Sequence, residues 1–424
     1  MTTKDNVTWD RAVPVYGIPV LTKGFWILAG IVVVSGLLTV IREIIGLNTM
    51  SGMTDGYAWG MWKTFNVMVL TGLGSGAFAV GIGAWVFNQH KLHSVMRVAL
   101  LTSFLAYSSG LIMLGIDVGR PWNFYWIAWP VTWNLSSPLL EVAVCITVYA
   151  SIPLFLENIP PLLEYVFYYL PRFRKYVAMI EKPFIKVYAG IVALAYILPM
   201  MHQSSLGALM LLGGARVHTL WQSPLLPLLY VWAAAFLGYA CVILAVLMAN
   251  LTWKRPLDME VMELLSKIGA GLIYGWAVVR LLDILVRGQF LAMFGFKGLY
   301  FAGLFWLEMA LIVGGAYIAR SERGKDKGIF FYAWLAVAVG GMIYRFSPTT
   351  LAFSARPNSF YFPNFWEFTM GCGYIALCVL GYLAAVKKLA ILPGTKEDWM
   401  KMAEYEKSVH PEVQLTGYEK AVEN

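Results

Sequence analysis

The chain has few charged residues for its length. Charged side chains make up 13% of its 424 residues, whereas a soluble globular protein carries about 25%. Hydrophobic residues make up 59%, and the polar side chains that remain are too few to cover so much apolar surface. This balance excludes a soluble globular enzyme and a disordered chain, and it argues against nucleic-acid binding.

Cysteine is also scarce. The chain has four cysteines, all inside apolar runs and none in a CxxC motif, namely Cys145, Cys241, Cys372 and Cys378. They are therefore expected to be buried small hydrophobes rather than ligands of zinc or of an iron–sulfur cluster. The polar first 23 residues do not resemble a cleaved signal peptide.

Long apolar runs are what the sequence has in abundance. A membrane-spanning helix needs about 20 mostly apolar residues, and ten runs meet that length, near 24–42, 64–88, 97–116, 137–157, 184–202, 224–251, 264–287, 299–318, 329–347 and 367–388. A β-barrel would instead show short segments of alternating polarity. We therefore predict an all-α integral membrane protein with about ten transmembrane helices, arranged as two four-helix bundles plus peripheral helices.

Lysine and arginine are distributed unevenly between the two sets of connections. If the N-terminus lies on one side, that side receives 22 of the 32 basic residues and the opposite side receives 8. Because cytoplasmic loops carry an excess of Lys and Arg, both termini are predicted to be cytoplasmic. The chain then divides into a cytoplasmic segment 1–23, a ten-helix domain 24–388 and a cytoplasmic tail 389–424. The net charge of +8 follows from this topology.

Ionisable side chains inside or at the ends of the apolar runs are rare. They are costly to place in hydrocarbon and commonly mark functional sites. Most lie toward the side opposite the termini, where Asp117 and Arg120 end the third run, Glu141 lies about one turn into the fourth and His202 ends the fifth. Antiparallel threading of these runs predicts that Asp117, Glu141 and His202 share one depth.

A second group of ionisable residues lies in the seventh and eighth runs. Arg280 and Asp283 are three residues apart, so they share one helix face and are expected to form a neutralised pair. Glu308 lies near the middle of the eighth run. These three residues form a candidate proton relay, and the alternative is that they only join helices.

The first group suits a quinone headgroup. Such a ligand needs hydrogen-bond partners for two carbonyls, an apolar channel for its tail and groups that exchange protons. Tyr107 lies on the same run as Asp117, and Gly74 and Gly76 on the second run would let a helix or a flat ring approach closely. The structural alternatives are a helix-end ion pair for Asp117, a helix cap for His202 and helix packing for the glycines.

Two other functions stay open on the residues alone. A b-type haem needs two axial ligands, usually histidines, on facing helices at one depth, and no two of the five histidines lie well inside different runs. A transporter would favour broken helices and a polar site at the midplane. Pro199 and the segment 224–227 could break helices, but the acidic groups cluster toward one face.

Several segments resemble the NrfD/PsrC family of polysulfide reductase membrane subunits, and within it the HybB-like branch of hydrogenase-2 membrane subunits. These segments are GLGSGAF (72–78), DVGRPWNFY (117–125), SSPLLE (136–141), MHQSSLGALMLLGG (201–214) and LWQSPLLPLLY (220–230). The most specific feature is HQSSLG followed by the Trp-Gln-Ser-Pro turn. The resemblance covers roughly residues 20–390.

The resemblance implies a quinone-reactive anchor subunit of a respiratory complex in the cytoplasmic membrane of a prokaryote. Such a subunit has no haem or iron–sulfur cluster of its own. It exchanges electrons between menaquinone, or a related quinone, and a ferredoxin-like 4Fe–4S subunit on the outer face. Catalytic or cytochrome subunits complete the complex, so this chain would not hold the catalytic centre.

The resemblance also implies roles for individual residues. It places the quinone near Asp117, Glu141 and Tyr107, with Arg120 acting on the neighbouring carboxylate. His202 and Gln203 belong to the signature of the branch. A docked ring would then lie between the second, third and fourth runs, near the outer face.

Overall fold

The computed structural model describes residues 12–14, 21–57, 59–117, 121–356 and 359–394, together with residues 398, 400 and 404. Within these ranges, ten helical segments are long and apolar enough to cross a membrane. They are Lys23–Ile45, Met61–Val86, His90–Ile116, Pro138–Phe167, Lys186–Leu211, Leu226–Trp253, Met259–Val286, Leu299–Arg320, Lys327–Leu351 and Phe365–Lys388. The predicted all-α membrane architecture is therefore confirmed.

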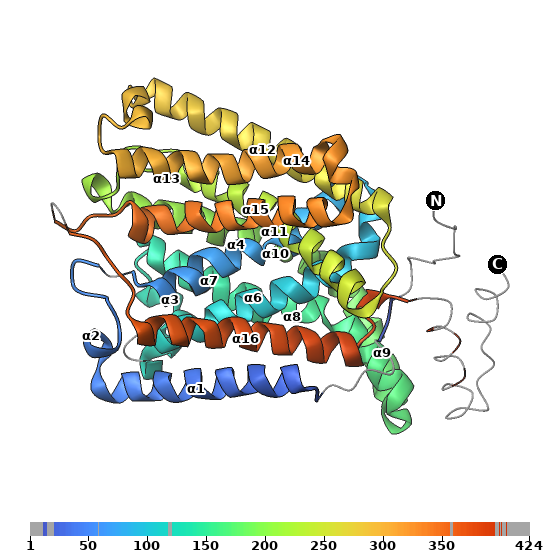
Figure 1. Ribbon diagram of the computed structural model, residues 1–424. Helices are drawn as coiled ribbons and strands as arrows, with labels where there is room; N and C mark the ends of the chain where they lie inside the picture. Colours follow the sequence, from blue (N-terminus) through green and yellow to red (C-terminus); the bar gives the residue numbers. More distant parts are fainter. Residues whose placement is uncertain are drawn as a thin grey trace.

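The long helices run roughly parallel to one another (Figure 1). The main ones are α1 (Lys23–Ile45), α6 (Met96–Asp117), α7 (Pro138–Ser151), α10 (Arg174–Leu211), α11 (Leu226–Trp253), α12 (Met259–Val286), α13 (Leu299–Met309), α14 (Gly315–Arg320), α15 (Lys327–Phe346) and α16 (Phe365–Lys388). We call the side on which α1 begins and α16 ends the terminal face. The opposite side is the loop face.

Contacts between helices group eight of the ten segments into two bundles. The first bundle contains the second span (Met61–Val86) with α6, α7 and α10, and the second bundle contains α11, α12, α13–α14 and α15. Helix α11 joins the bundles because it also packs on α10 and on α5 (Gly76–Gly81). Helices α1 and α16 pack mainly on each other, and α16 also contacts α6. The two bundles with peripheral helices match the predicted arrangement.

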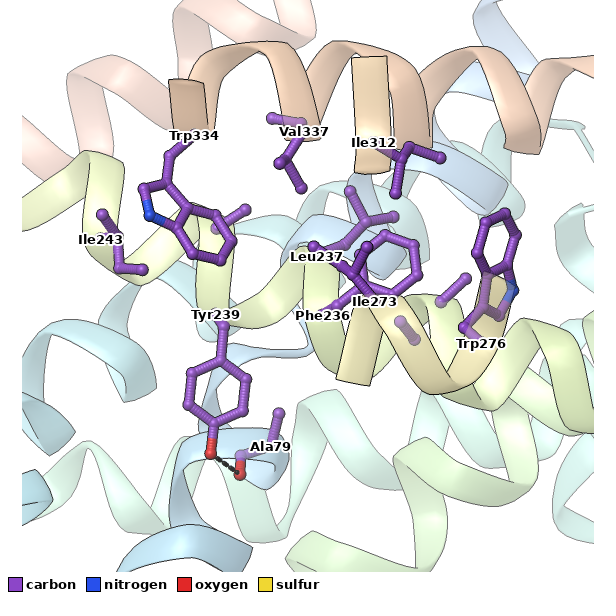
Figure 2. Packing of buried hydrophobic residues seen from close by; sticks show 14 of the residues in the cluster. Ala79, Phe236, Leu237, Tyr239, Ile243, Ile273, Trp276, Ile312, Trp334 and Val337 are labelled. Carbon is purple, nitrogen blue, oxygen red and sulfur yellow. Dashed lines mark hydrogen bonds between the residues drawn. The ribbon is translucent and has the colours of Figure 1, made fainter. Parts of the chain in front are cut away.

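The core is centred on α11. Figure 2 shows side chains of α11 meeting those of α12 and α15, including Phe236, Leu237, Ile273, Trp276, Trp334 and Val337. The Tyr239 hydroxyl donates a hydrogen bond of 3.1 Å to the carbonyl of Ala79, which ties α11 to the first bundle. Packing and this bond together hold the two bundles in one unit.

Small residues allow α5 and α11 to approach closely. A Cβ on Gly238 would lie 2.6 Å from the backbone nitrogen of Gly76, and a Cβ on Gly76 would lie 2.8 Å from a methyl of Val242. A Cβ on Gly74 would lie 3.3 Å from the ring of Tyr107. Gly74 and Gly76 therefore have a packing role, whatever part they play toward a ligand.

Several spans depart from regular α-helix. The second span contains the π-helical segments η1 (Thr64–Leu70) and η2 (Ile82–Val86), with a turn at Gly74–Ser75 between α4 (Thr71–Leu73) and α5. Segments η9 (Ala310–Gly314) and η11 (Ser347–Leu351) interrupt or follow helices of the second bundle. Such π segments are frequent at functional sites. In contrast, α10 continues through Pro183 and Pro199, so the break at Pro199 considered for a transporter is absent.

The two ends of the described chain meet at the terminal face. Strand β1 (Ala12–Val13) pairs antiparallel with β2 (Leu392–Pro393). Arg255 donates hydrogen bonds of 2.8 Å to the carbonyl of Pro14 and of 2.6 Å to Asp398. Most of the predicted segments 1–23 before α1 and 389–424 after α16 lies outside the described residues.

Candidate functional site

A cavity of about 460 Å³ lies at the loop-face end of the first bundle. We call it the loop-face pocket. It is bounded by the start of the second span, the end of α6, the 3-10 helix η4 (Pro121–Ala128) and the start of α7, together with residues just before these spans. The lining residues are Trp59, Lys63, Val67, Leu114, Asn123, Ile127, Ser137, Leu139, Leu140, Val142 and Ala143. Its volume falls in the range of small-molecule pockets.

The lining of the loop-face pocket is mostly apolar, with few polar groups. Lys63, Asn123 and Ser137 supply hydrogen-bond donors. The Lys63 ammonium lies 5.3 Å from the centroid of the Trp59 ring, within range of a cation–π contact. None of these residues was among the predicted site residues, because a single Lys or Asn beside a loop gives no local pattern.

A row of buried polar side chains begins directly behind the wall of this pocket. We call His202, Tyr107, Gln203 and Arg345 the polar row. The Nδ1 atom of His202 lies 3.2 Å from the carbonyl oxygen of Val142, which lines the pocket. The His202 ring lies 5.5 Å from the ring of Tyr107. His202 is fully buried and well inside α10, so its predicted position at the end of a span is wrong.

The rest of the polar row connects the two bundles through hydrogen bonds. The Gln203 amide donates to the Tyr107 hydroxyl at 3.1 Å, and its Oε1 accepts a bond of 2.8 Å from Arg345 Nη1. Arg345 Nη2 donates to the carbonyl of Tyr230 at 2.6 Å. All four side chains of the row are fully buried, so the row places α6, α10, α11 and α15 in a fixed relation.

Arg345 is the member of the polar row that was not among the predicted site residues. It lies near the end of α15 and is completely buried. The predicted ninth run, 329–347, contains it, so the rule that flags ionisable residues within spans applies to it. Its place beside the last loop of the loop face gave no sign that it reaches Gln203.

Three predicted site residues, Glu141, Asp117 and Arg120, are close in the sequence to residues that line the loop-face pocket. Glu141 is in the first turn of α7 with an exposed side chain, and its neighbours Leu140 and Val142 line the pocket. Leu114 of α6 also lines the pocket, and α6 ends at Asp117. The Asp117 side chain and all of Arg120 lie outside the described residues.

The second bundle contains a different polar cluster. Arg280 of α12 forms a fully buried ion pair with Glu308 of α13. Glu308 also accepts hydrogen bonds from Trp221 Nε1 at 3.0 Å and from the Ser347 hydroxyl at 3.3 Å. We call Arg280, Glu308, Trp221 and Ser347 the ion-pair cluster.

The predicted pairing of Arg280 with Asp283 is wrong. Asp283 instead forms an ion pair of 2.7 Å with Arg287, the residue that directly follows the end of α12. Arg280 reaches into the bundle, where its guanidinium lies 4.8 Å from the Phe305 ring centroid and 4.8 Å from that of Tyr344. The sequence gives helix faces but not the partner that a neighbouring helix supplies.

Two residues of the loop face, His218 and Tyr361, contact neighbouring segments of the chain. His218 stacks on Phe301 with ring centroids 4.2 Å apart, and its Nε2 lies 3.2 Å from the Lys297 carbonyl. Burial lowers the pKa of His218, so its ring is neutral at pH 7. The Tyr361 hydroxyl donates a 2.5 Å bond to Glu367, and burial raises the pKa of Tyr361.

The described histidines do not form a pair suited to haem ligation. His90 and His93 lie in η3 (His90–Val95) at the terminal face, His202 lies inside α10 and His218 lies in a loop. His410 is outside the described residues. Over the described ranges, no group of three His, Cys, Asp or Glu residues could hold a metal ion.

Comparison with known proteins places this architecture in a family. The family model described as "Polysulphide reductase, NrfD" matches residues 49–347. The chain belongs to the NrfD family. The match includes the second to eighth spans and most of the ninth, and therefore nearly all of both four-helix bundles.

Named relatives of this NrfD protein come from bacterial hydrogenases and reductases. It is 31% identical over 383 residues to the probable Ni/Fe-hydrogenase 2 b-type cytochrome subunit of Escherichia coli (strain K12), covering 89% of this chain and 95% of the relative. It is 28% identical over 379 residues to the integral membrane subunit of menaquinone reductase from Nitratidesulfovibrio vulgaris, covering 82% and 86%. These likenesses confirm the resemblance to the NrfD family and to its hydrogenase-2 branch.

Proposed function

We propose that this NrfD protein is the quinone-reactive membrane anchor of a respiratory oxidoreductase complex. In this proposal it exchanges electrons between menaquinone, or a related quinone, and an iron–sulfur partner. The loop-face pocket is the observation that carries the proposal, because it is a cavity of about 460 Å³ with apolar walls and a few hydrogen-bond donors. A relative named as a menaquinone reductase subunit supports the choice of ligand.

The pocket has the chemical groups that a quinone ring requires. Its apolar residues suit the flat ring and the start of an isoprenoid tail. The Lys63 ammonium, the Asn123 amide and the Ser137 hydroxyl are available to donate hydrogen bonds to the two ring carbonyls. A cation near a carbonyl oxygen stabilises the negative charge that develops there when the ring accepts electrons.

Protons must move together with the electrons. Reduction of a quinone to a quinol takes up two electrons and two protons, and oxidation releases the same number. We assign this exchange to Asp117 and Glu141, which lie at the ends of α6 and α7 that border the pocket. Arg120 supplies the countercharge for Asp117 in this proposal.

The polar row positions the wall of the pocket. His202 contacts the backbone of Val142, and Tyr107 and Gln203 connect His202 to Arg345. A change in this row would shift α7 relative to α6 and therefore alter the pocket. Contacts of Gly74 and Gly76 with the quinone stay a prediction.

We place the electron partner at the loop face. Exposed aromatic residues gather there on η4, where Trp122 and Trp126 are 70% and 47% exposed. The proposed partner is a ferredoxin-like 4Fe–4S subunit, with catalytic or cytochrome subunits attached to it. The excess of Lys and Arg toward the terminal face supports a cytoplasmic position for both termini and an outward loop face.

The name of the Escherichia coli relative raises the question of a haem. A b-type haem needs two axial side chains on facing helices. The described histidines do not supply such a pair, because His202 alone lies well inside a span. We therefore route no electron step through a haem.

A proton relay through Arg280, Asp283 and Glu308 is a separate proposal. Arg280 and Glu308 contact each other, and Ser347, which directly follows α15, extends the contact to that helix through a 2.9 Å bond to the Ile343 carbonyl. Asp283 belongs to a different pair with Arg287. A relay would therefore have to pass from Glu308 through the buried side chains of α15 rather than along α12.

A substitution that fills the loop-face pocket tests the proposed function. Ala143→Trp adds an indole ring to the pocket wall and should weaken binding of the quinol analogue HOQNO at least ~100-fold, because the ring occupies the ligand volume. Val131→Trp is the matched control, since Val131 is 97% exposed at the same face. Equal HOQNO affinity in the two folded variants would contradict the proposal.

A further inference from the structure

A second cavity lies in the half of the membrane-spanning region nearer the terminal face. It has a volume of about 330 Å³ and is bounded by the second span, α6, α11 and α16. Residues that represent its four walls are Leu73, Leu105, Ala245, Met248 and Leu383. We call this cavity the terminal-side groove. It is separate from the loop-face pocket, since the two share no lining residue.

Most of the lining of the terminal-side groove is apolar. Thr102 is one of its few polar residues, and its hydroxyl already donates to backbone carbonyls of its own helix, at 2.9 Å to Val98 and 3.0 Å to Ala99. The other donors of its lining, Thr252, Trp253 and Tyr382, gather at the end nearest the terminal face. A quinone ring placed between the apolar walls would therefore leave its carbonyls without donors, which is costly. The groove therefore fits a hydrocarbon chain.

The end of the groove nearest the membrane surface has the features of a lipid headgroup region. Trp253 and Tyr382 both line the groove, and their rings stack with centroids 6.4 Å apart. Tryptophan and tyrosine favour the membrane interface. Lys254 directly follows Trp253, Lys388 ends α16, and both are exposed.

We infer that the terminal-side groove binds one acyl chain of an anionic phospholipid, with the headgroup near Lys254 and Lys388. Basic residues between transmembrane helices are a common way to bind such headgroups. A cavity of about 330 Å³ suits a single hydrocarbon chain. It is too small for a helix of a partner protein, because such a helix has a diameter of about 10–12 Å. This inference does not rest on quinone binding at the loop-face pocket.

A bound chain would join a peripheral helix to the bundles. Helix α16 contacts α6 directly, and the groove lies between α16 and α11. A lipid that binds only the folded protein stabilises it in proportion to its affinity and concentration. We therefore expect the anionic phospholipid to raise the temperature at which the purified protein unfolds.

The test uses the full chain in detergent with a photoactivatable phosphatidylglycerol that carries a diazirine in its acyl chain. Crosslinks are expected on peptides of α11 and α16 that line the groove. Ala245→Phe fills the groove and should reduce these crosslinks at least tenfold. Val278→Phe is the matched control, because Val278 of α12 is 55% exposed and lies away from the groove.

The headgroup is tested by charge removal and by competition. Unlabelled phosphatidylglycerol should compete at a lower concentration than phosphatidylcholine. The double variant Lys254→Gln/Lys388→Gln should weaken competition by phosphatidylglycerol at least fivefold. Lys327→Gln is the control, since Lys327 is exposed at the same face but outside the groove.

Three outcomes would overturn the inference. Crosslinks that persist in a folded Ala245→Phe variant would mean ordinary surrounding lipid. A short-chain menaquinone that competes better than phosphatidylglycerol would make the groove a quinone-tail site. Equal competition by phosphatidylcholine would remove the role of the two lysines. If Ala245→Phe fails to fold, Leu383→Trp fills the groove from α16 and serves the same test.

Discussion

The two four-helix bundles of this protein differ in how their interiors are filled. The first bundle contains the loop-face pocket, and the polar side chains behind it are joined by hydrogen bonds whose acceptors are uncharged. The second bundle contains the Arg280–Glu308 ion pair, which aromatic rings surround. Similar helix packing thus surrounds a ligand-sized space in the first bundle and a buried ion pair in the second.

The difference shows how one architecture can combine a binding site with a rigid support. Removing one partner of a buried ion pair strongly destabilises the folded protein, so the pair fixes the helices that carry it. The loop-face pocket sits among loops and helix ends, where the backbone has fewer constraints. Arg345 joins the two regions, since it binds Gln203 of the first bundle and the backbone of Tyr230 in the second.

The largest expected effect comes from breaking the ion pair. Glu308→Gln leaves the Arg280 charge buried without its partner and should lower the free energy of unfolding by about 3–5 kcal/mol. Unfolding in mixed detergent micelles, followed by circular dichroism, measures the loss. Glu322→Gln is the control, because its pair with Lys325 is exposed and should change stability very little.

The double variant Arg280→Met/Glu308→Leu sharpens this test. It removes both charges and should recover most of the lost stability, since no unpaired charge remains. If Glu308→Gln is as stable as Glu322→Gln, the ion-pair cluster does not support the second bundle in the way proposed here.

The second prediction compares one substitution in the two bundles. Asp117→Asn should lower quinone turnover at least tenfold while the complex still assembles, because the amide cannot exchange the proton. Asp283→Asn should keep turnover, since Asp283 pairs with Arg287 away from the loop-face pocket. Turnover is measured with the complete complex and a soluble quinone. Full activity in a normally expressed Asp117→Asn variant would remove Asp117 from the mechanism.

The third prediction compares two fully buried tyrosines. Tyr107→Phe removes the hydroxyl that contacts Gln203 and Ser75, and it should reduce HOQNO affinity by about 3- to 10-fold, the effect of one hydrogen bond. Tyr344→Phe should have no such effect, because Tyr344 faces Arg280 in the second bundle. Equal changes in both variants would show that the polar row does not position the pocket.

The smallest expected effect is a pH dependence at His218. Its pKa is lowered in the folded protein by burial, so the unfolded chain binds the proton first as the pH falls. Its contribution to stability is therefore fully present above the ordinary pKa of about 6.5 and is lost progressively below it. Unfolding midpoints at pH 7.5 and pH 5.5 should differ less in His218→Asn than in His90→Asn. An equal difference would contradict this role.

Much of the fold could be predicted because span length is a local property of the sequence. The predicted runs 224–251 and 264–287 correspond to Leu226–Trp253 and Met259–Val286. The fifth span was placed too short, because the polar residues His202 and Gln203 end its apolar run although the helix continues to Leu211. Those side chains find partners inside the bundle, which the sequence does not reveal.

The site was less accessible to prediction because it depends on contacts between helices. Tyr107, His202 and Gln203 do lie together. Arg280 binds Glu308 rather than Asp283 because α13 brings the closer acceptor. Lys63 and Asn123 line the loop-face pocket only because the second span and η4 meet there.

The most direct measurement is a fluorescence-quench titration of the purified protein with HOQNO, accompanied by absorbance spectra before and after reduction with dithionite. We expect saturable binding near one site per chain, loss of that binding in Ala143→Trp and no haem bands. Saturable binding that Ala143→Trp leaves unchanged would place the quinone outside the loop-face pocket. Haem bands in the reduced spectrum would contradict the interpretation of the histidines.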